Sequence, residues 1–448
     1  MSNTQSQAYP VWSNRLTYIL ATTGAAVGLG NIWKFPYIAG ENGGGAFVLM
    51  YLLCILLLGI PIMIAEVMLG RKGRANPIHA VLAQARAAGL SKGWSFIGIM
   101  GVAAGIMILM FYSVVAGWSL EYVVQSASSS YMDKTPADVA AGFGELAKDG
   151  SRQLIWHSVF LMATAAIVGL GVTRGIGNAV NILMPVLFLL LLSLLVYSYQ
   201  NGNFSEALNF MFSADFSKLT GDSVLVAMGH AFFTLSLGMG TVMVYGSYMP
   251  ENQSIPGAVV TVAFLDTLIA LIAGMTIFPL VFASGLEPGS GPGLLFETLP
   301  IAFSKMWGGA FFGAGFFLLI SIAALSSSIS LIEPGISWLE KLGIKRMAAT
   351  IGLTVLCWIG GAASIYSAEV FDTLDHLTSN IMLPLGGLLI AIFVGWRLGY
   401  TRVRKEVSGG SNMLFNLWFI VLRFVAPIGV MLVFYESIKN ILASYGII

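Results

Sequence analysis

Two short segments combine glycines with side-chain oxygens inside long apolar stretches. The first runs from Gly24 to Asn31, and the second runs from Thr234 to Gly240. Glycines at this density unwind a helix, and the released carbonyl and N–H groups need partners when hydrocarbon surrounds them. Oxygen ligands suit a hard cation such as sodium, and half-helix N-termini attract a carboxylate. Such paired breaks predict a binding site near the bilayer midplane, with close helix packing by glycine as the alternative.

Asp266 lies in the middle of another apolar stretch. An ionised side chain at that depth costs about 2.5 to 3.5 kcal/mol on insertion scales and is rarely kept without a partner. We therefore expect an ion site at Asp266, with a structural aspartate bonded to neighbouring hydroxyls as the alternative. A buried carboxylate that loses its cation is stabilised by taking up a proton. We therefore expect Asp266 to bind a proton whenever its cation is absent, and to carry that proton when the protein returns without cation or substrate.

The elements that position these residues are membrane helices. Of the 448 residues, 57% are hydrophobic and only 10% are charged, which indicates a chain embedded in a lipid bilayer. We expect an all-α polytopic membrane protein with eleven transmembrane helices. They are predicted near residues 16–38, 44–69, 96–123, 154–171, 176–198, 223–248, 257–284, 307–339, 347–363, 377–396 and 414–435.

The broken helices fall in spans 1 and 6, and this placement predicts a 5+5 inverted repeat. Residues 1–200 would form the first five-helix repeat, 201–398 the second, and 399–448 an additional span 11. Thirteen Lys and Arg fall in one set of loops and six in the other. This bias predicts a plasma-membrane protein whose N-terminus is cytoplasmic and whose C-terminus is outside.

Several motifs are specific to a known family. They are Trp12 and Arg15, Gly28-Leu29-Gly30-Asn31, Phe35-Pro36, Glu41-Asn42-Gly43-Gly44-Gly45-Ala46-Phe47, Gly59-Ile60-Pro61 with Glu66, and Phe232-Phe233-Thr234-Leu235-Ser236-Leu237-Gly238. With these motifs the chain resembles the neurotransmitter:sodium symporters over nearly its whole length, and in particular their bacterial eleven-span amino-acid transporters. The resemblance implies a leucine-transporter-type fold and sodium-coupled import by alternating access.

The resemblance also implies two sodium ions as coupling ions, each held by oxygens. The first site would use Ala26, Asn31, Thr234 and Asp266 together with the substrate carboxylate. The second would use carbonyls of Gly24, Val27 and Ala323 with the hydroxyls of Ser326 and Ser327. Many relatives have a neutral Asn at the position of Asp266 and need a nearby chloride. The carboxylate of Asp266 therefore predicts chloride-independent transport.

A mostly apolar substrate pocket follows from the same resemblance. Its expected lining is Ala25, Ala26, Leu29, Gly30, Ile108, Tyr112, Phe233, Thr234, Ser236, Met239, Ser327 and Leu331. Amine-transporting relatives hold an Asp near Ala25, and its absence here favours α-amino acids. Met239 replaces a Phe of a relative selective for small aliphatic substrates, and its flexibility favours hydrophobic or aromatic L-amino acids. The alternatives are another small zwitterion, such as an osmolyte, and an amino-acid sensor built on this fold.

The expected gates match the family less closely. Lys34 stands where most relatives have an Arg that pairs with an outer Asp, here Asp375 or alternatively Asp372. At the inner gate the usual ion pair is replaced by Tyr9 and Lys341, which leaves Trp12 and Tyr248 as the predicted inner seal.

Three further features are expected to support the gates and the broken helices. Gly175 and Pro185 have the spacing at which relatives unwind span 5 toward the second sodium site. Glu66 and Glu333 are expected to anchor unwound backbone.

Nothing in the chain indicates an enzyme. The four histidines show no metal-ligand spacing, and His230, which replaces a family Gln, is expected to make a structural hydrogen bond. We expect no enzymatic cofactor and no nucleic-acid partner. The expected partners are the substrate, sodium and the bilayer.

Overall fold

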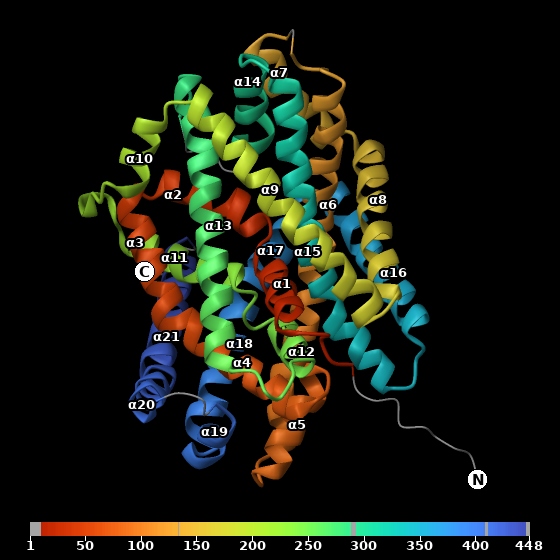
Figure 1. Cartoon of the computed structure of the whole chain (residues 1–448), viewed down its shortest axis with the longest axis vertical. Helices are drawn as coiled ribbons and strands as arrows, with labels where there is room; N and C mark the ends of the chain where they lie inside the picture. Colours follow the sequence, from red (N-terminus) through yellow and green to blue (C-terminus); the bar gives the residue numbers. More distant parts are fainter. Residues whose placement is uncertain (1–9, 133, 288–292, 408–410, 445–448) are drawn as a thin grey trace.

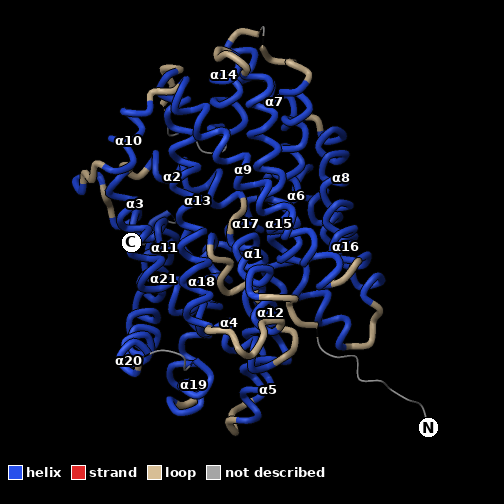
Figure 2. The backbone as a smooth tube through the Cα atoms, viewed as in Figure 1, coloured by secondary structure: helices blue, strands red, loops and turns tan. Residues whose placement is uncertain are grey.

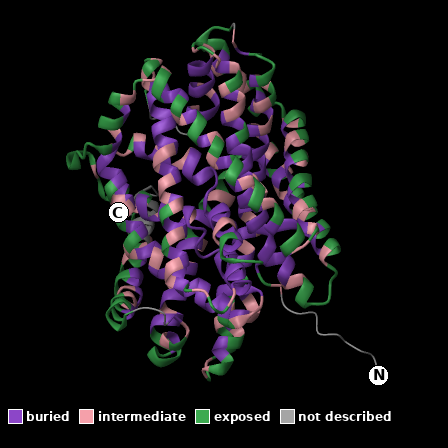
Figure 3. Cartoon of the chain, in the orientation of Figure 1, coloured by how far each residue is buried: buried purple, intermediate pink, exposed green. Residues whose placement is uncertain are grey.

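The computed structural model describes residues 10–132, 134–287, 293–407 and 411–444, and within them the regular secondary structure is helix, apart from one isolated β-bridge. The helices stand side by side along the long axis of the molecule, with short connections at both ends (Figures 1 and 2). The predicted all-α class is confirmed. Buried residues fill the middle of the bundle and exposed residues face outward (Figure 3). Because many exposed side chains are large and apolar, the outer face suits lipid.

Helices cover every predicted apolar stretch. The first half contains α1 (Arg15–Ala26), η1 (Gly30–Lys34), α2 (Phe35–Glu41), α3 (Gly45–Cys54), η2 (Ile55–Gly59), α4 (Ile60–Gly73), α5 (Pro77–Ala87), η3 (Lys92–Ser95), α6 (Phe96–Ala127), α7 (Pro136–Lys148), α8 (Gly150–Gly169), η4 (Val172–Gly177), α9 (Asn178–Asn201) and α10 (Phe204–Phe212).

The second half contains η5 (Phe216–Lys218), α11 (Gly221–Thr234), α12 (Thr241–Ser247), α13 (Ile255–Ala283), η6 (Leu294–Thr298), α14 (Leu299–Ser304), α15 (Gly309–Lys341), α16 (Arg346–Tyr366), α17 (Ala368–Asp375), η7 (His376–Met382), α18 (Leu383–Ile392), η8 (Phe393–Arg397), α19 (Tyr400–Val407), α20 (Asn412–Ile420), η9 (Val421–Val425) and α21 (Ala426–Ser444).

Eight helical stretches of the described chain are long and apolar enough to cross a membrane. Three predicted spans are not among these eight. One is α8, and the other two are the glycine-interrupted helices, each of which is divided into short pieces. The count of eleven spans and the inverted repeat therefore stay predictions. Even so, eight long apolar helices in one chain establish a multi-pass membrane architecture.

Both predicted breaks are present as unwound backbone. The first helix ends at Ala26 and Val27 adopts an extended conformation (φ −72°, ψ 106°). The second ends at Thr234, after which Ser236 and Gly238 have positive φ angles of 54° and 77°. A positive φ is strained for serine, and such strain is typical of functional sites. At Gly238 a Cβ would lie only 2.5 Å from the carbonyl oxygen of Leu383, so glycine is required there.

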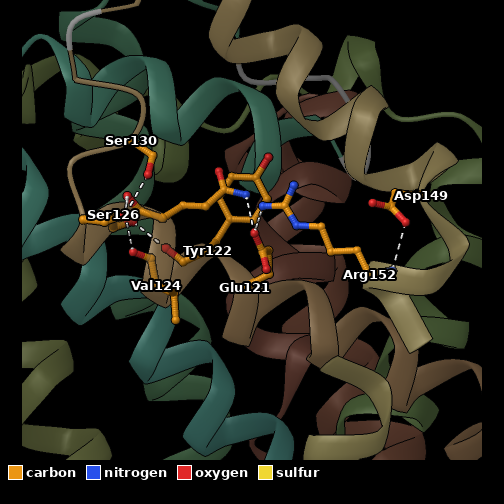
Figure 4. Close-up of polar contacts among 9 residues, drawn as sticks. Glu121, Tyr122, Val124, Ser126, Ser130, Asp149 and Arg152 are labelled. Atoms are coloured by element: carbon orange, nitrogen blue, oxygen red, sulfur yellow. Dashed lines mark hydrogen bonds and ion pairs between the residues drawn. The ribbon is translucent and has the colours of Figure 1, made fainter. Parts of the chain in front are cut away.

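The two ends of α6 and α8 that lie near α7 are joined by a polar network (Figure 4). The buried Glu121 carboxylate forms an ion pair with Arg152 and accepts a hydrogen bond from Gln125 Nε2 at 2.9 Å. Asp149 caps α8 by accepting from the Arg152 backbone N–H at 3.0 Å. Because α6 lines the central site, this anchor fixes one wall of it.

Candidate substrate and sodium site

A cluster of polar side chains surrounds Asp266, which is fully buried on α13. Asn31 Nδ2 donates to Asp266 Oδ1 at 2.8 Å and to the Asp266 carbonyl at 3.0 Å. Thr234 Oγ1 lies 3.1 Å from both carboxylate oxygens. Asn31 Oδ1 in turn accepts from the Gly28 N–H at 3.1 Å. The two broken helices and α13 therefore bring the side chains predicted for the first sodium site into one hydrogen-bonded group.

A second group of oxygens joins α1 to α15. Ser327 Oγ lies 3.4 Å from the Gly24 carbonyl oxygen and 3.3 Å from that of Val27. Ser326 Oγ donates to the Ala323 carbonyl at 2.9 Å. These five residues are the set predicted for the second sodium site. Carbonyl and hydroxyl oxygens without a carboxylate suit a monovalent cation better than a divalent one.

Between these groups lies a small internal cavity of about 20 Å³. It is lined by Ala25, Ala26, Gly28, Leu29, Gly30, Ile108, Tyr112, Phe233, Ser236, Met239, Ser327 and Leu331. Eleven of the twelve residues predicted for the pocket are in this lining. Thr234 is not, because its hydroxyl faces Asp266. The lining also contains Gly28, which was not predicted because glycine has no side chain from which a contact with the pocket could be inferred.

Two contacts shape the cavity wall. Ser236 Oγ donates to the Ala25 carbonyl at 2.8 Å, which ties one broken helix to the other. The Tyr112 hydroxyl accepts a hydrogen bond from the Leu29 backbone N–H at 3.3 Å, so it satisfies a donor that unwinding of the helix leaves free. A volume of about 20 Å³ is only slightly above the roughly 10 to 15 Å³ that a cavity needs to hold one water molecule. An amino acid can therefore enter only if lining side chains repack.

The comparisons with known proteins agree with this geometry. The sequence model of the sodium:neurotransmitter symporter family matches residues 9–136 and 144–446. The chain belongs to the sodium:neurotransmitter symporter family. It is 36% identical to the uncharacterised sodium-dependent transporter YhdH of Bacillus subtilis, over 97% of this chain and 99% of that protein. A sodium-dependent transporter of Haemophilus influenzae is 34% identical over the same shares.

A crystal structure of MhsT in complex with L-phenylalanine is also similar to this chain. It shares 42% identity and a TM-score of 0.88, covering 96% of this chain and 99% of that one. Membership in the sodium:neurotransmitter symporter family makes the chain a sodium-dependent symporter and a multi-pass membrane protein. It is a transporter and not an enzyme.

On one side of the central pocket lies a second cavity of about 190 Å³. It shares Leu29, Gly30, Tyr112 and Phe233 with the pocket, so the two rings of Tyr112 and Phe233 lie between them. We call this cavity the vestibule, and that it faces the outer side of the membrane stays a prediction.

The residues predicted for the outer gate line this vestibule. Lys34, Asp372 and Asp375 are all in its wall. Lys34 Nζ lies 4.9 Å from the centre of the Phe233 ring, and Asp375 accepts from Ser379 Oγ at 2.8 Å. No ion pair joins Lys34 to either aspartate in the part of the chain that the structure describes. Lys34 thus lies directly above the ring that separates vestibule and pocket.

The predicted inner seal is a packed aromatic cluster. The Trp12 ring contacts the Tyr248 ring edge to face at 5.8 Å between ring centres, and the backbone N–H of Trp12 donates to the Tyr248 carbonyl at 2.9 Å. Tyr245, which the sequence did not single out, adds a second edge contact at 5.3 Å and accepts from Trp12 Nε1. Tyr9 lies outside the described residues.

Glu66 and Glu333 differ in role. Glu66 Oε1 accepts from the Gly238 N–H at 2.7 Å, so it does anchor unwound backbone. For Glu333 that prediction was wrong. Its carboxylate pairs with Arg346 at 2.5 Å and accepts from the Tyr248 hydroxyl at 2.8 Å. Arg346 reaches it because α16 begins just after the turn that ends α15, which brings the two side chains together despite thirteen positions of separation.

Arg346 also contacts Glu340 at 3.0 Å and the Val168 carbonyl at 2.9 Å. With Glu333 and Tyr248 it forms a network that borders a cavity of about 510 Å³. Lys341 lines the same cavity and forms none of these ion pairs. The network therefore joins α8, α15 and α16 to Tyr248, which directly follows α12, on the side where the inner seal is predicted.

Two further predictions concern α9 and His230. Residues 172–201 are helical throughout, with a π-turn at Gly175 and with Pro185 inside α9, so the segment is wound here. The predicted hydrogen bond of His230 was wrong: neither ring nitrogen has a partner among the described residues. The ring instead stacks on Phe35 at 5.9 Å and packs on Tyr51 at 5.3 Å. The His230 ring therefore packs against two aromatic rings and does not make the expected hydrogen bond.

Proposed function

We propose that the chain imports hydrophobic and aromatic L-amino acids, driven by two sodium ions and without chloride. The observation that carries this proposal is the placement of the Asp266 cluster beside the apolar cavity between the broken helices. A substrate carboxylate at the unwound segment would reach a sodium ion held by Asn31, Thr234, Asp266 and the Ala26 carbonyl. Such a shared ligand makes substrate and ion binding mutually dependent.

The substrate class is inferred from the lining and from a relative. Ile108, Met239 and Leu331 supply apolar surface, and no carboxylate lines the cavity. An amine without a carboxylate would therefore have no partner for its charge. MhsT, at 42% identity, is a protein whose crystal structure contains L-phenylalanine. Because Met repacks readily, Met239 can make room for an aromatic ring that the closed cavity does not accommodate.

Chloride independence rests on charge. Two sodium ions and a zwitterion bring a net positive charge into the middle of the membrane, where an unbalanced charge is costly. The Asp266 carboxylate, buried and bonded to Asn31 and Thr234, supplies one negative charge at the first site. Asp266 would then take up a proton once sodium has left, and proton return with the empty carrier is part of the proposal.

The second site would couple ion release to the inner side. Ser327 belongs to both the cavity lining and the second oxygen group, so sodium there lies next to the substrate. Unwinding of α9 between Gly175 and Pro185 would open a path to it. Each sodium contributes about 2.3 kcal/mol per 100 mV and about 1.4 kcal/mol per tenfold gradient. Two ions would support accumulation of at least about ten-thousandfold.

The experiment is uptake of radiolabelled phenylalanine into proteoliposomes that contain the purified chain. We expect uptake to require external sodium, to continue when chloride is replaced by gluconate, and to carry two sodium ions per phenylalanine. Uptake of glycine betaine in place of phenylalanine would support the osmolyte alternative. Tight binding without any flux across the membrane would support the sensor alternative. In either case the proposed function would be wrong.

A further inference from the structure

A cavity of about 130 Å³ lies away from the transport pathway, at the end of the molecule formed by α19 and α20 (Figure 1). Its walls come from α4, the start of α13, α19 and the start of α20. Ile64, Phe415 and Trp418 form an apolar part, whereas Arg404, Asn412 and Ser254 form a polar part. The volume is several times the roughly 10 to 15 Å³ that a cavity needs to hold one water molecule. The cavity is therefore large enough for part of a ligand that is polar at one end and apolar at the other.

Within the described part of the chain, no carboxylate pairs with the charge of Arg404. Among the described residues its guanidinium contacts only neutral groups, the Asn412 amide oxygen and the Tyr400 hydroxyl and ring. Glu406 is the only acidic residue of α19, and it is already paired with Arg71 at 3.1 Å and Lys72 at 3.9 Å. Two neutral acceptors leave N–H donors of the guanidinium free for an anion.

The mouth of the cavity opens toward lipid. Leu414, one of its lining residues, is 64% exposed, and its neighbours Met413 and Leu417 are 80% and 57% exposed. Large apolar side chains this exposed on a membrane helix face hydrocarbon. The basic residues of this end, Arg402, Arg404 and Lys405, lie on the side that the charge bias assigns to the cytoplasm.

We propose that this cavity binds an anionic phospholipid of the inner leaflet, with the phosphate on Arg404 and an acyl chain along Ile64, Phe415 and Trp418. Guanidinium groups bind phosphate oxygens through paired N–H donors, and basic pockets between membrane helices on the cytoplasmic side bind anionic headgroups. Because α19 is fixed to α4 by Glu406 and Arg71, a lipid here would link α4, α13, α19 and α20. The site touches neither sodium group nor the substrate cavity, so it does not depend on the proposed substrate.

The test uses the purified full-length protein in a nonionic detergent. Dioleoyl phosphatidylglycerol or dioleoyl phosphatidylcholine is titrated in, and bound lipid is counted by native mass spectrometry while the midpoint of thermal unfolding is recorded. We expect phosphatidylglycerol to bind and to raise the midpoint, and phosphatidylcholine to do neither. The Arg404→Gln variant should bind phosphatidylglycerol about tenfold more weakly, the expected loss when a charged hydrogen-bond partner is removed.

Two matched controls distinguish a defined binding site from nonspecific attraction to surface charge and from nonspecific hydrophobic binding. Arg402→Gln removes the same charge from an exposed position of α19 outside the cavity and should leave binding unchanged. Leu414→Trp fills the mouth and should weaken binding although Arg404 is intact, whereas Leu417→Trp should not. A cooperative thermal unfolding transition without added lipid, at the midpoint of the unaltered chain, reports that each variant is folded. Equal affinity in Arg404→Gln, equal loss in Arg402→Gln, equal binding of phosphatidylcholine, or the same stabilisation by glycerol 3-phosphate would each overturn the proposal.

Discussion

Replacing Gly28 with alanine tests how closely the ion group and the substrate pocket are joined. A Cβ at Gly28 would lie 2.5 Å from Ser327 Oγ and 2.9 Å from the Tyr112 hydroxyl. Both distances are too short for a methyl group, so both side chains must turn away. Ser327 Oγ would then leave the Gly24 and Val27 carbonyls, and Tyr112 would lose its contact with the Leu29 N–H.

The expected size follows from these contacts. One lost oxygen ligand or charge-assisted contact is worth about 1 to 3 kcal/mol, which corresponds to roughly ten- to hundredfold in affinity. We therefore expect Gly28→Ala to require at least about tenfold more sodium for half-maximal phenylalanine binding. The fold should survive, because hydroxyl and side-chain rotation relieves the clash without moving backbone.

The assay is scintillation-proximity binding of radiolabelled phenylalanine over a sodium titration, with the thermal unfolding midpoint measured in parallel. Gly229→Ala is the matched control, since it adds the same methyl group to the other broken helix where no atom lies within 4 Å. A Gly28→Ala protein that folds and keeps the sodium dependence of the unaltered chain would refute the reasoning. So would a loss of equal size in Gly229→Ala.

Three further predictions follow from single contacts. Asp266→Asn removes the negative charge of the first site, so phenylalanine uptake should become chloride-dependent, and its dependence on internal pH should disappear; uptake that is unchanged in gluconate would contradict this. Met239→Phe should lower affinity for tryptophan relative to leucine by about tenfold, the usual size for one added group in an apolar pocket, as measured by competition; an unchanged ratio would place the side chain outside the specificity surface. Arg346→Gln leaves the buried Glu333 carboxylate with only Tyr248 as a partner and should lower the free energy of unfolding by up to about 3 kcal/mol. Adding Glu333→Gln should restore part of that loss, as measured by thermal unfolding. If the losses of the two single variants simply add in the double variant, the ion pair does not contribute as described.

The broken helices were predictable because their signal is local. Glycines beside Asn31 and Ser236 in apolar sequence have few physical explanations, and both segments are unwound in the structure. The grouping of Asp266 with Asn31 and Thr234 followed from the family resemblance, since the three come from separate helices and no spacing rule joins them. Gly28 was missed as a lining residue because a glycine has no side chain from which to infer a contact.

The partners of Glu333, Lys34 and His230 were the hardest to predict. Glu333 was expected to meet backbone, yet Arg346 reaches it across the α15–α16 turn, an approach that depends on the angle between two helices. Lys34 was expected to pair with Asp375 or Asp372; it shares a cavity wall with both, but its ammonium group lies over the Phe233 ring, and no ion pair joins it to either aspartate among the described residues. His230 likewise packs among rings that come from distant parts of the chain. In each case tertiary geometry chooses among several partners of similar chemistry, and sequence patterns do not encode that choice.

The central claim is that a sodium ion and the carboxylate of a hydrophobic amino acid bind together between the broken helices. The most direct test is binding of radiolabelled phenylalanine to the purified protein, in sodium and in potassium, with each of the twenty amino acids as a competitor. We predict binding only in sodium, with displacement by hydrophobic and aromatic amino acids and little displacement by charged ones. Binding that persists in potassium, or that no amino acid displaces, would contradict the account.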